Sequence, residues 1–337
     1  MRVWEVASFG IENLALVERP EPVAGPGQVV VKVRAVSLNF RDLLVVKGRY
    51  NPKMRLPRIP CSDGAGEVAA VGEGVSTVRV GDRVAGIFMQ NWLDGELNQA
   101  KSRGALGGDV DGMLAQYVVL AESGVIRVPD HLSFQEAATL PCAGVTAWSA
   151  LTRATTTKAG DVVVVQGTGG VSLFALQFAK MMGARVLGTS GSDEKLARAL
   201  ALGLAAGVNY KTNPDWAAWV FEQTGRVGAD LVVEVGGAGT FQQSLKAVRV
   251  EGTVAQIGAL SGAKQEIELT PILHKRIRVM GIYVGSKDDF AAMNRALEQN
   301  PGVKPLIDQV FPFAEAPRAF AAMESATHFG KLVIEVP

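Results

Sequence analysis

A glycine-rich turn near the middle of the chain has the spacing of a phosphate-binding site. Three glycines stand within four residues, directly after a run of four valines and before an amphipathic segment. Glycine tolerates the unusual φ angles of a tight turn and lets the backbone approach a pyrophosphate. The free N–H groups at the start of the following helix attract anions. We therefore predict that a dinucleotide binds at Gly167, Thr168, Gly169, Gly170 and Val171, although Ser172 replaces the third glycine of GxGxxG.

The residues after the next apolar strand favour NADP over NAD. In NAD-binding folds an acidic side chain at the end of this strand receives the ribose hydroxyls. Here the strand at 184–188 leads into Thr189-Ser190-Gly191-Ser192, with no acid. A carboxylate would repel a 2′-phosphate, whereas Ser190 donates a hydrogen bond and Lys195 adds positive charge. The alternative is that Ser190 is a turn residue and Lys195 an exposed helix lysine.

The chain contains two cysteines, Cys61 and Cys142. Two cysteines cannot form a disulfide framework for a chain of this size, and alone they are too few for a tetrahedral zinc site. This usage is typical of the reducing cytoplasm.

The elements around the glycine turn alternate between strands and helices. We expect helices at 134–153 and 171–182, and a further helix with Ser192 as its N-cap. Short apolar strands are expected at 162–165, 184–188, 230–235, 252–257 and 277–284, and several end at glycine. This alternation predicts a doubly wound α/β sheet with its ligand at the carboxyl ends of the strands.

The first 125 residues have a different pattern, in which strands and turns predominate. They are rich in β-branched runs bounded by Pro, Gly and Asp, at 28–36, 66–71 and 74–84. The segment 90–112 is polar and carries five glycines, so we predict a long surface loop. The C-terminal segment from Phe311 predicts a helix and a final strand at 331–336.

The composition excludes several classes of protein. A length of 337 residues fits two domains, and 48% hydrophobic residues with a net charge of +1 describe an ordinary soluble globular protein. No polybasic surface indicates nucleic acid or anionic lipid as a partner. Neither a signal-peptide apolar core nor an 18-residue apolar run is present, so we expect neither secretion nor a membrane span.

Ordered motifs along nearly the whole chain resemble the medium-chain dehydrogenase/reductase superfamily, in its zinc-independent quinone oxidoreductase-like branch. The matches are Pro26-Gly27-Gln28-Val29, Val36–Asp42, Pro60–Glu67, Val80–Val84, Leu140–Trp148, the glycine turn and Gly330-Lys331-Leu332. The resemblance implies a Rossmann doubly wound parallel sheet plus a GroES-like, mostly β catalytic domain. Residues 1–128 would begin the catalytic domain, 129–272 would bind NADP, and 273–337 would return to complete the catalytic domain.

The chain departs from its zinc-containing relatives at the metal ligands. Asn39 stands at the position of a cysteine and Ser62 at the position of a histidine, while Asp63 and Cys142 match ligand positions. Catalytic zinc needs three protein ligands of suitable type. The four cysteines of the structural zinc loop are also absent from 90–112. We therefore predict no zinc, with Cys142 as a buried filler.

Without a Lewis acid, reduction of a conjugated C=C or a quinone is easier than alcohol oxidation, because hydrogen-bond donors can hold the developing oxyanion. The resemblance implies that Asn39 lies near the nicotinamide. It also matches Tyr50 to the tyrosine proposed as proton donor in mitochondrial-type enoyl thioester reductases. The alternatives are a turn-stabilising Asn39 and a Tyr50 resting on the cleft rim. For Arg41 and Asp42 we favour mutual pairing or a helix start.

The resemblance also implies further residues that contact the cofactor, and an oligomeric state. It implies that Thr146 lies near the nicotinamide and that Tyr210 lies beside Lys195 at the adenosine phosphate. It further implies that the strand at 277–284 pairs between subunits, which makes a homodimer. The remaining implied contacts to NADP(H) are Gly258, Ala259, Leu260, Ile282, Tyr283, Val284 and Lys331, the last at the pyrophosphate.

Three functions remain open at this point. The first is an NADPH-dependent, zinc-independent reductase of quinones or α,β-unsaturated carbonyls. The second is an alcohol dehydrogenase of the same superfamily, and the third is a non-catalytic NADPH-binding protein or redox sensor. The sequence does not identify the substrate.

Overall fold

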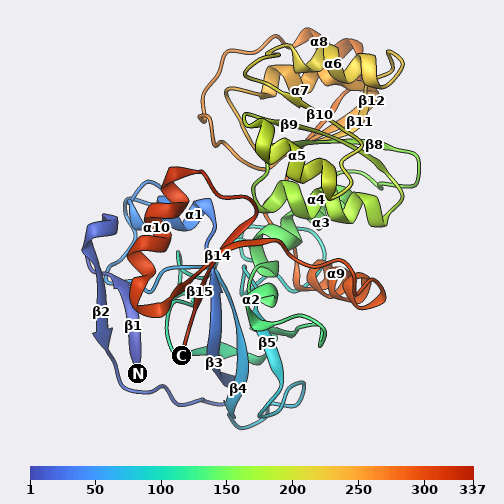
Figure 1. Cartoon of the computed structure of the whole chain (residues 1–337). Coiled ribbons are helices and arrows are strands. Elements are labelled where there is room, and N and C mark those ends of the chain that lie inside the picture. Colours follow the sequence, from blue (N-terminus) through green and yellow to red (C-terminus); the bar gives the residue numbers. More distant parts are fainter. The chain divides into compact units, whose positions relative to one another are not determined.

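The computed structural model describes all 337 residues and divides the chain into two compact units (Figure 1). Unit 1 contains Met1–Val145 and Gly285–Pro337, and unit 2 contains Thr146–Val284. The sequence places the junctions at 128/129 and 272/273, so both lie further along the chain than expected. One contact that holds the segment before residue 146 in unit 1 is the Cys142 backbone N–H, which donates to the Asp63 carboxylate.

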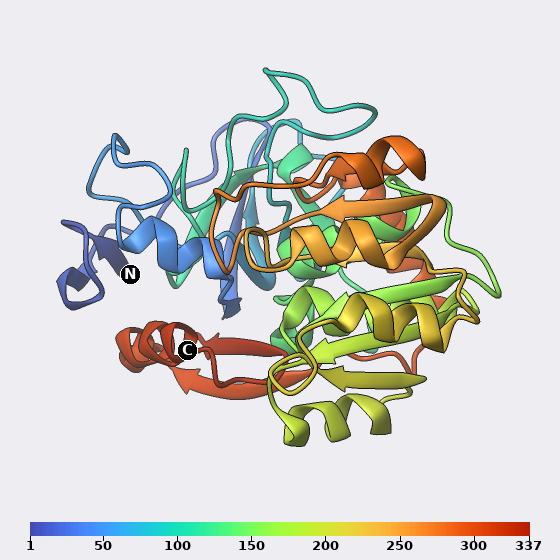
Figure 2. The same ribbon diagram turned by 90° about the horizontal axis from the view of Figure 1, so that it is seen from above.

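A parallel six-stranded sheet forms the centre of unit 2, in the order β10-β9-β8-β11-β12-β13. This topology confirms the predicted doubly wound sheet, and the strand arrows of unit 2 run the same way in Figure 2. Strands covered on both faces need no polar alternation, and Val163, Val164 and Val232 are fully buried. The strands are β8 (Val162–Gln166), β9 (Arg185–Ser190), β10 (Ala206–Asn209), β11 (Ala229–Glu234), β12 (Val248–Gln256) and β13 (Arg278–Gly281).

Helices pack on this sheet through an apolar cluster that includes Val164, Leu187, Val220 and Leu245. Ser192 caps the helix that follows β9, as predicted, because its hydroxyl accepts the Lys195 backbone N–H. The helices are α3 (Val145–Thr152, which begins at the junction), α4 (Gly170–Met181), α5 (Asp193–Ala201), α6 (Trp216–Gln223), α7 (Phe241–Ala247) and α8 (Thr270–His274).

Strand β13 is shorter than the predicted strand at 277–284. The Ile282 N–H still donates to the Gln256 carbonyl, but Val284 has a φ of +59°. That left-handed conformation is incompatible with an extended strand and rare for a β-branched residue. All four residues of β13 are exposed at the edge of the sheet.

Unit 1 contains a larger sheet in the order β14-β15-β3-β4-β5-β7, with β6 also paired to β3. Most of its pairs are antiparallel, and β14 and β15 are parallel. The run at 74–84 yields only the start of the short β5, because residues 74–82 form turns and irregular backbone. The strands are β3 (Gln28–Ser37), β4 (Asp63–Val71), β5 (Arg83–Gly86), β6 (Tyr117–Ala121), β7 (Val125–Arg127), β14 (Ile307–Pro312) and β15 (Lys331–Glu335), and β1 (Arg2–Val6) with β2 (Leu14–Glu18) forms a separate two-stranded sheet.

The predicted helix at 134–153 is broken into three pieces. A π-helical turn at Leu140–Gly144 separates α2 from α3, and Pro141 within it has no N–H to continue an α-helix. The helices of unit 1 are α1 (Phe40–Val46), α2 (Phe134–Ala137), α9 (Lys287–Gln299) and α10 (Ala316–Ser325), with 3-10 turns at Ile11–Asn13, Glu122–Gly124 and Phe313–Glu315.

The segment 90–112 contains no helix or regular strand, as predicted for a long loop. Polar contacts order it internally. An ion pair joins Asp94 to Lys101 at 2.9 Å, and the Asp109 carboxylate accepts the N–H groups of Gly104 and Ala105. None of the helices of the chain has the length and apolar character that crossing a membrane requires.

Candidate functional site

The glycine turn of unit 2 has the backbone geometry of an anion site. Gly167 has a φ of +69°, in the left-handed region that favours glycine. A Cβ at either Gly167 or Gly169 would meet no atom within 4 Å, so the turn borders open space. Gly169 is the N-cap of the twelve-residue helix α4 and offers no capping side chain. The first N–H groups of α4 are therefore available to a phosphate, which fits a dinucleotide.

Ser172 has a structural task in the turn. It is buried in the first turn of α4, and its hydroxyl donates to the Gln166 carbonyl at 2.6 Å. This bond ties the start of the helix to the end of β8. The departure from GxGxxG is therefore a substitution that adds a hydrogen bond across the turn.

A buried carboxylate beside the turn was missed by the sequence reasoning. Glu234, at the end of β11, is fully buried. One of its oxygens accepts the N–H groups of Gly236 and Gly237 at 2.8 and 2.9 Å, and the Thr240 hydroxyl at 2.5 Å. Its other oxygen accepts the Gln166 amide at 2.7 Å and the Ser244 hydroxyl. The sequence did contain a signal for this residue, because Glu234 ends an apolar strand and is followed closely by Gly236 and Gly237.

The end of β9 gathers the residues predicted at the adenosine phosphate. Ser190 is buried, its hydroxyl accepts the Ser192 N–H at 3.2 Å, and its carbonyl accepts the Tyr210 N–H at 3.0 Å. A Cβ on Gly191 would lie 2.6 Å from the Tyr210 hydroxyl and 3.0 Å from Lys211 Cε. Lys195 lies in the first turn of α5. Lys211 is thus a second lysine beside Gly191 that the sequence reasoning missed.

The other predicted cofactor residues of unit 2 differ in burial. Thr146 and Ile282 are buried, as is the strained Val284. Tyr283 and Leu260 are exposed at 42% and 54%. Gly258 and Ala259 belong to the turn after β12, where Gly258 donates its N–H to the Glu234 carbonyl at 3.2 Å.

In unit 1, the predicted catalytic residue Asn39 is bonded to Lys331. The Lys331 ammonium donates to Asn39 Oδ1 and to the Leu38 carbonyl, both at 2.6 Å. Lys331 is only 3% exposed, and burial lowers the pKa of its ammonium. The expectation for Lys331 was a pyrophosphate contact, but the structure places its charge inside unit 1. The Asn39 Nδ2 group is buried and makes no hydrogen bond of good geometry, although the Asn39 side chain lies close enough to the Asp63 carboxylate to lower its pKa.

Asp63 is the second carboxylate of this cluster, at the start of β4. Its oxygens accept the Ser62 hydroxyl at 2.7 Å and the Cys142 N–H at 3.0 Å. Complete burial raises the pKa of Asp63 to about 6, against the opposing influence of the Lys331 charge. The sequence positions that match the metal ligands of the relatives thus come together in unit 1.

Arg41 and Asp42 have the structural roles favoured from the sequence. The Asp42 carboxylate accepts the Asn39 N–H at 2.9 Å at the start of α1, the Ser62 N–H at 3.2 Å, and the Arg41 guanidinium at 3.0 Å. Arg41 also donates to the Leu106 carbonyl at 2.8 Å. Asp42 therefore connects the N-terminus of α1 to the residues before β4.

Tyr50 lies at the surface near this cluster. It is 36% exposed, and the Arg41 guanidinium lies 4.8 Å from its ring centroid. Arg41 also lies 5.1 Å from the centroid of the Phe88 ring, so two aromatic side chains contact the cation. This contact orients the Tyr50 ring but leaves its proposed proton transfer a prediction.

The donor set of the cluster does not fit a catalytic zinc ion. No three His, Cys, Asp or Glu side chains gather at a metal-binding distance anywhere in the chain. Burial raises the pKa of the Cys142 thiol well above its usual value, which opposes the thiolate that zinc requires. The Lys331 ammonium already uses Asn39 Oδ1. A divalent ion here would face a fixed positive charge and too few ligands.

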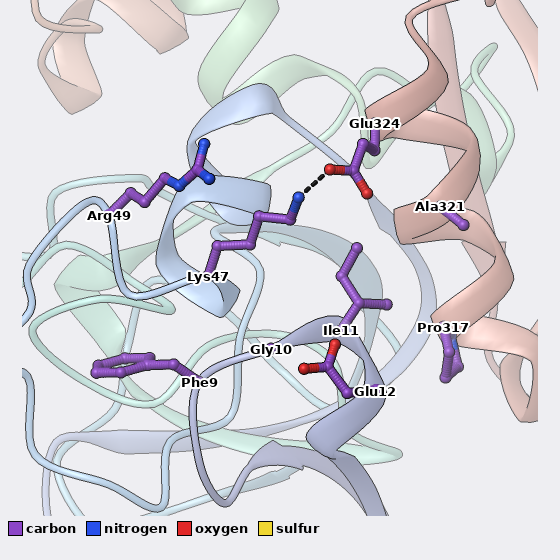
Figure 3. A pocket seen from close by; sticks show the side chains of 9 residues that line it. All are labelled: Phe9, Gly10, Ile11, Glu12, Lys47, Arg49, Pro317, Ala321 and Glu324. Carbon is purple, nitrogen blue, oxygen red and sulfur yellow. Dashed lines mark hydrogen bonds and ion pairs between the residues drawn. The ribbon is translucent and has the colours of Figure 1, made fainter.

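A separate surface pocket of about 580 Å³ lies elsewhere on unit 1 (Figure 3). An ion pair between Lys47 and Glu324 borders it. Its other lining residues are Phe9, Gly10, Ile11, Glu12, Arg49, Pro317 and Ala321. None of the predicted catalytic or cofactor residues lines this pocket, so the pocket does not locate the chemistry.

Comparisons with known proteins agree with this layout. Residues 25–130 match the alcohol dehydrogenase GroES-like domain, and residues 170–299 match the zinc-binding dehydrogenase family. A zinc-type alcohol dehydrogenase-like protein of Schizosaccharomyces pombe is 42% identical over 92% of this chain and 91% of its own length.

Solved structures extend the similarity to the fold. A putative alcohol dehydrogenase from Sinorhizobium meliloti is 43% identical, with a TM-score of 0.93 over 99% of this chain and 98% of that one. A mycobacterial quinone oxidoreductase is 28% identical, with a TM-score of 0.82 over 100% of both chains. With its Rossmann sheet, its GroES-like domain and relatives of this identity, the chain belongs to the medium-chain dehydrogenase/reductase superfamily of nicotinamide-dependent oxidoreductases.

Proposed function

We propose that the protein is an NADPH-dependent, zinc-independent reductase that transfers a hydride to a quinone or to an α,β-unsaturated carbonyl, such as an enone or enoyl thioester. The observation that carries this proposal is the cluster around Asn39. It offers an unpartnered amide donor and a buried ammonium where zinc-containing relatives have metal ligands. Such a site can hold an oxyanion by hydrogen bonding but lacks a Lewis acid.

The chemistry of an enone substrate divides between the cofactor and these residues. A bound reduced nicotinamide supplies a hydride to the β-carbon. The C=C electron pair then shifts, and negative charge develops on the carbonyl oxygen. The Asn39 Nδ2–H group donates a hydrogen bond to that oxygen. The Tyr50 hydroxyl gives a proton to the α-carbon, which completes the addition of one hydride and one proton.

The preference for NADPH rests on the end of β9. Ser190, Tyr210 and Lys211 surround Gly191, and Lys195 lies in the first turn of the next helix. Two lysines and two hydroxyls suit a 2′-phosphate, because charge-assisted hydrogen bonds to phosphate are strong. The Asp193 carboxylate, in the first turn of α5, accepts the Asn209 amide at 2.8 Å.

The decisive experiment is a substrate panel monitored by cofactor absorbance. Quinones, enones and enoyl thioesters are tested with NADPH and NADH, together with metal analysis of the purified protein. We expect turnover with NADPH on at least one of these classes and zinc near zero per chain. Zinc near one per chain with oxidation of alcohols would replace this proposal by the alcohol dehydrogenase that several relatives' names indicate. Tight NADPH binding without turnover would indicate a binding protein or redox sensor.

A Tyr50→Phe variant tests the proton donor. Loss of the hydroxyl should lower kcat about 100-fold on an enone while leaving NADPH affinity unchanged, because general acid catalysis contributes at least that much. Thermal unfolding checks that the ring still packs on Arg41. Unchanged turnover would make Tyr50 a residue of the rim.

We also propose a cytoplasmic homodimer. Both cysteines are free thiols. The exposed edge strand β13 presents Val279 and Met280, with Leu273 nearby in sequence at 74% exposure. An exposed apolar edge strand can pair with its copy across a two-fold axis. Light scattering of the wild type and of a Val279→Lys variant tests this assembly, and a monomeric wild type would refute it.

A further inference from the structure

We infer that Lys331 is a positioning residue for Asn39: its buried ammonium fixes the orientation of the Asn39 amide, so that Nδ2 becomes the donor that holds the substrate oxygen. This inference rests on the proposed function and adds a residue to it. It also assigns to Lys331 a role different from the pyrophosphate contact expected from the sequence.

The chemistry of the two side chains decides the orientation of the amide. A lysine ammonium has three donors and no acceptor, so only the oxygen of the Asn39 amide can face it. The Nζ–Oδ1 distance of 2.6 Å fits a charge-assisted hydrogen bond. Because the amide is planar, Nδ2 must then point away from Lys331. A rotated amide would place two donors against a buried cation.

The unpartnered state of Nδ2 indicates that a ligand completes the site. Buried polar groups in folded proteins are almost always hydrogen-bonded, and a buried unpaired donor is destabilising. The Asn39 N–H and Oδ1 are both hydrogen-bonded, whereas Nδ2 makes no hydrogen bond of good geometry and has only the Asp63 carboxylate near it, whose pKa the Asn39 side chain lowers. A carbonyl or enolate oxygen of the substrate has the acceptor that Nδ2 lacks, and an enolate accepts more strongly.

The charges around Lys331 explain why the ammonium is retained in a buried position. Asp42 and Asp63 supply two carboxylates, and Arg41 pairs with Asp42 at 3.0 Å. Lys331 is the cation whose charge acts on Asp63. The backbone carbonyl of Leu38 takes a second ammonium N–H. Lys331 therefore supplies a fixed positive charge in the cluster whose counterpart in zinc-containing relatives holds a metal.

The test combines five variants of the full-length protein. Lys331→Met removes the ammonium, and Asn39→Asp keeps an oxygen for Lys331 but removes the Nδ2 donor. Asn39→Ala, made alone and together with Lys331→Met, completes a double-mutant cycle. Lys287→Met is the matched lysine control, because Lys287 is half-buried in the same unit and donates to the Ser123 carbonyl at 2.9 Å. Each variant is measured for NADPH affinity, for kcat and KM on the best substrate, and for unfolding in urea.

The expected results separate positioning from cofactor binding. Lys331→Met and Asn39→Asp should each lower kcat about 100-fold, in the range known for loss of one oxyanion donor. NADPH affinity should change less than threefold in both, and Lys287→Met should keep kcat. In the Asn39→Ala background, Lys331→Met should lower kcat by less than threefold more. A large loss of NADPH affinity in Lys331→Met with normal kcat at saturation would overturn the inference and restore the pyrophosphate role.

The unfolding measurements keep this inference distinct from the proposed function. A double-mutant cycle in unfolding free energy reports the Lys331–Asn39 contact without any substrate. If the wild type turns over no substrate in the panel, the proposed function fails, while a coupling in stability still supports the contact. Independent, additive effects of the two substitutions on both stability and kcat would refute the positioning role.

Discussion

Both units contain completely buried carboxylates, and two of them, Glu234 in unit 2 and Asp63 in unit 1, are compensated in different ways. Glu234 in unit 2 is surrounded by neutral donors, which are two backbone N–H groups, two hydroxyls and one amide. Asp63 in unit 1 accepts the Ser62 hydroxyl and the Cys142 N–H, has the Asn39 side chain beside it as a further donor that lowers its pKa, and depends on the charge of Lys331. The first arrangement is a finished hydrogen-bond network, and the second is a balance of charges.

This difference separates a structural site from a reactive one. Neutral donors from the backbone and from three side chains hold Glu234 in place, so it fixes the turns at the carboxyl ends of β8 and β11. Asp63 keeps a pKa of about 6 because burial outweighs its hydrogen bonds and the charge of Lys331. Perturbed titratable groups in clusters of this kind are frequent at functional sites. The comparison predicts that substitutions at Glu234 act on folding, whereas those at Asp63 act on pH dependence.

The largest effect is expected for Glu234→Ala. This change leaves five donors without their acceptor inside the core of unit 2, and each buried unpaired group is costly. We expect a loss of about 3 to 5 kcal/mol of unfolding free energy, measured in urea. Glu234→Gln is the matched variant, which keeps one acceptor and should lose less. A Glu234→Ala protein within 1 kcal/mol of wild type would contradict the view of Glu234 as a structural centre.

Asp63→Asn should change the pH dependence of stability by roughly 3 kcal/mol. The folded pKa of Asp63 is raised to about 6, above the unfolded value of about 4. The folded state therefore binds a proton more tightly, and the unfolding free energy falls as pH rises from about 4 to 6. The cost of burying the charge is fully present above pH 6 and absent below pH 4.

The measurement is the difference between wild type and Asp63→Asn in urea unfolding at several pH values. The variant should gain stability relative to wild type as pH rises through this window. A difference that stays constant from pH 4 to pH 7 would contradict the raised pKa.

The turn in unit 2 was predictable from the sequence because its determinants are local. Four valines, three glycines and an amphipathic helix occupy consecutive positions, and the structure places β8, the turn and α4 there. Ser192 as a cap was predictable for the same reason. The strand at 277–284 was overestimated, because apolar residues alone do not reveal the positive φ of Val284.

The contacts of the buried charges were not predictable in this way. Lys331 and Asn39 are 292 residues apart in sequence, and Gln166 and Glu234 are 68 apart. Strand β15 pairs with the end of β3, where Val333 lies opposite Ser37 and the Leu38 N–H donates to the Leu332 carbonyl. This register places Lys331 beside Asn39. A resemblance to a known family indicates which sequence positions belong to the site, but it does not tell in which direction the Lys331 side chain points.

A smaller effect is expected on cofactor affinity when the lysines that follow β9 are replaced, which extends the comparison to charges outside the core. Lys195→Ala and Lys211→Ala should each weaken NADPH binding about tenfold, which is about 1.4 kcal/mol, and leave NADH binding unchanged. Loss of a charge-assisted bond to the 2′-phosphate gives this size. Lys180→Ala is the control, because its ammonium donates to the Leu202 carbonyl at 2.7 Å. Equal weakening of NADPH and NADH would contradict a 2′-phosphate contact.

The smallest effect is expected for Ser172→Ala, which tests whether the network of Glu234 extends into the turn. The Gln166 side chain donates to Glu234, and its carbonyl accepts the Ser172 hydroxyl. Loss of one buried hydrogen bond should cost about 1 kcal/mol of unfolding free energy. Ser172→Gly, which restores GxGxxG, should cost more, because it also adds glycine to a helix.

A double-mutant cycle of Ser172→Ala with Glu234→Gln measures the coupling between the two contacts of Gln166. Because both contacts position the same residue, we expect a coupling of at least 0.5 kcal/mol in unfolding free energy. The same cycle should be visible in NADPH affinity, since Gln166 directly precedes Gly167. Additive effects on both quantities would show that Glu234 stabilises unit 2 without setting the geometry of the turn, and would confine the structural role of its network to β11 and the turn that follows it.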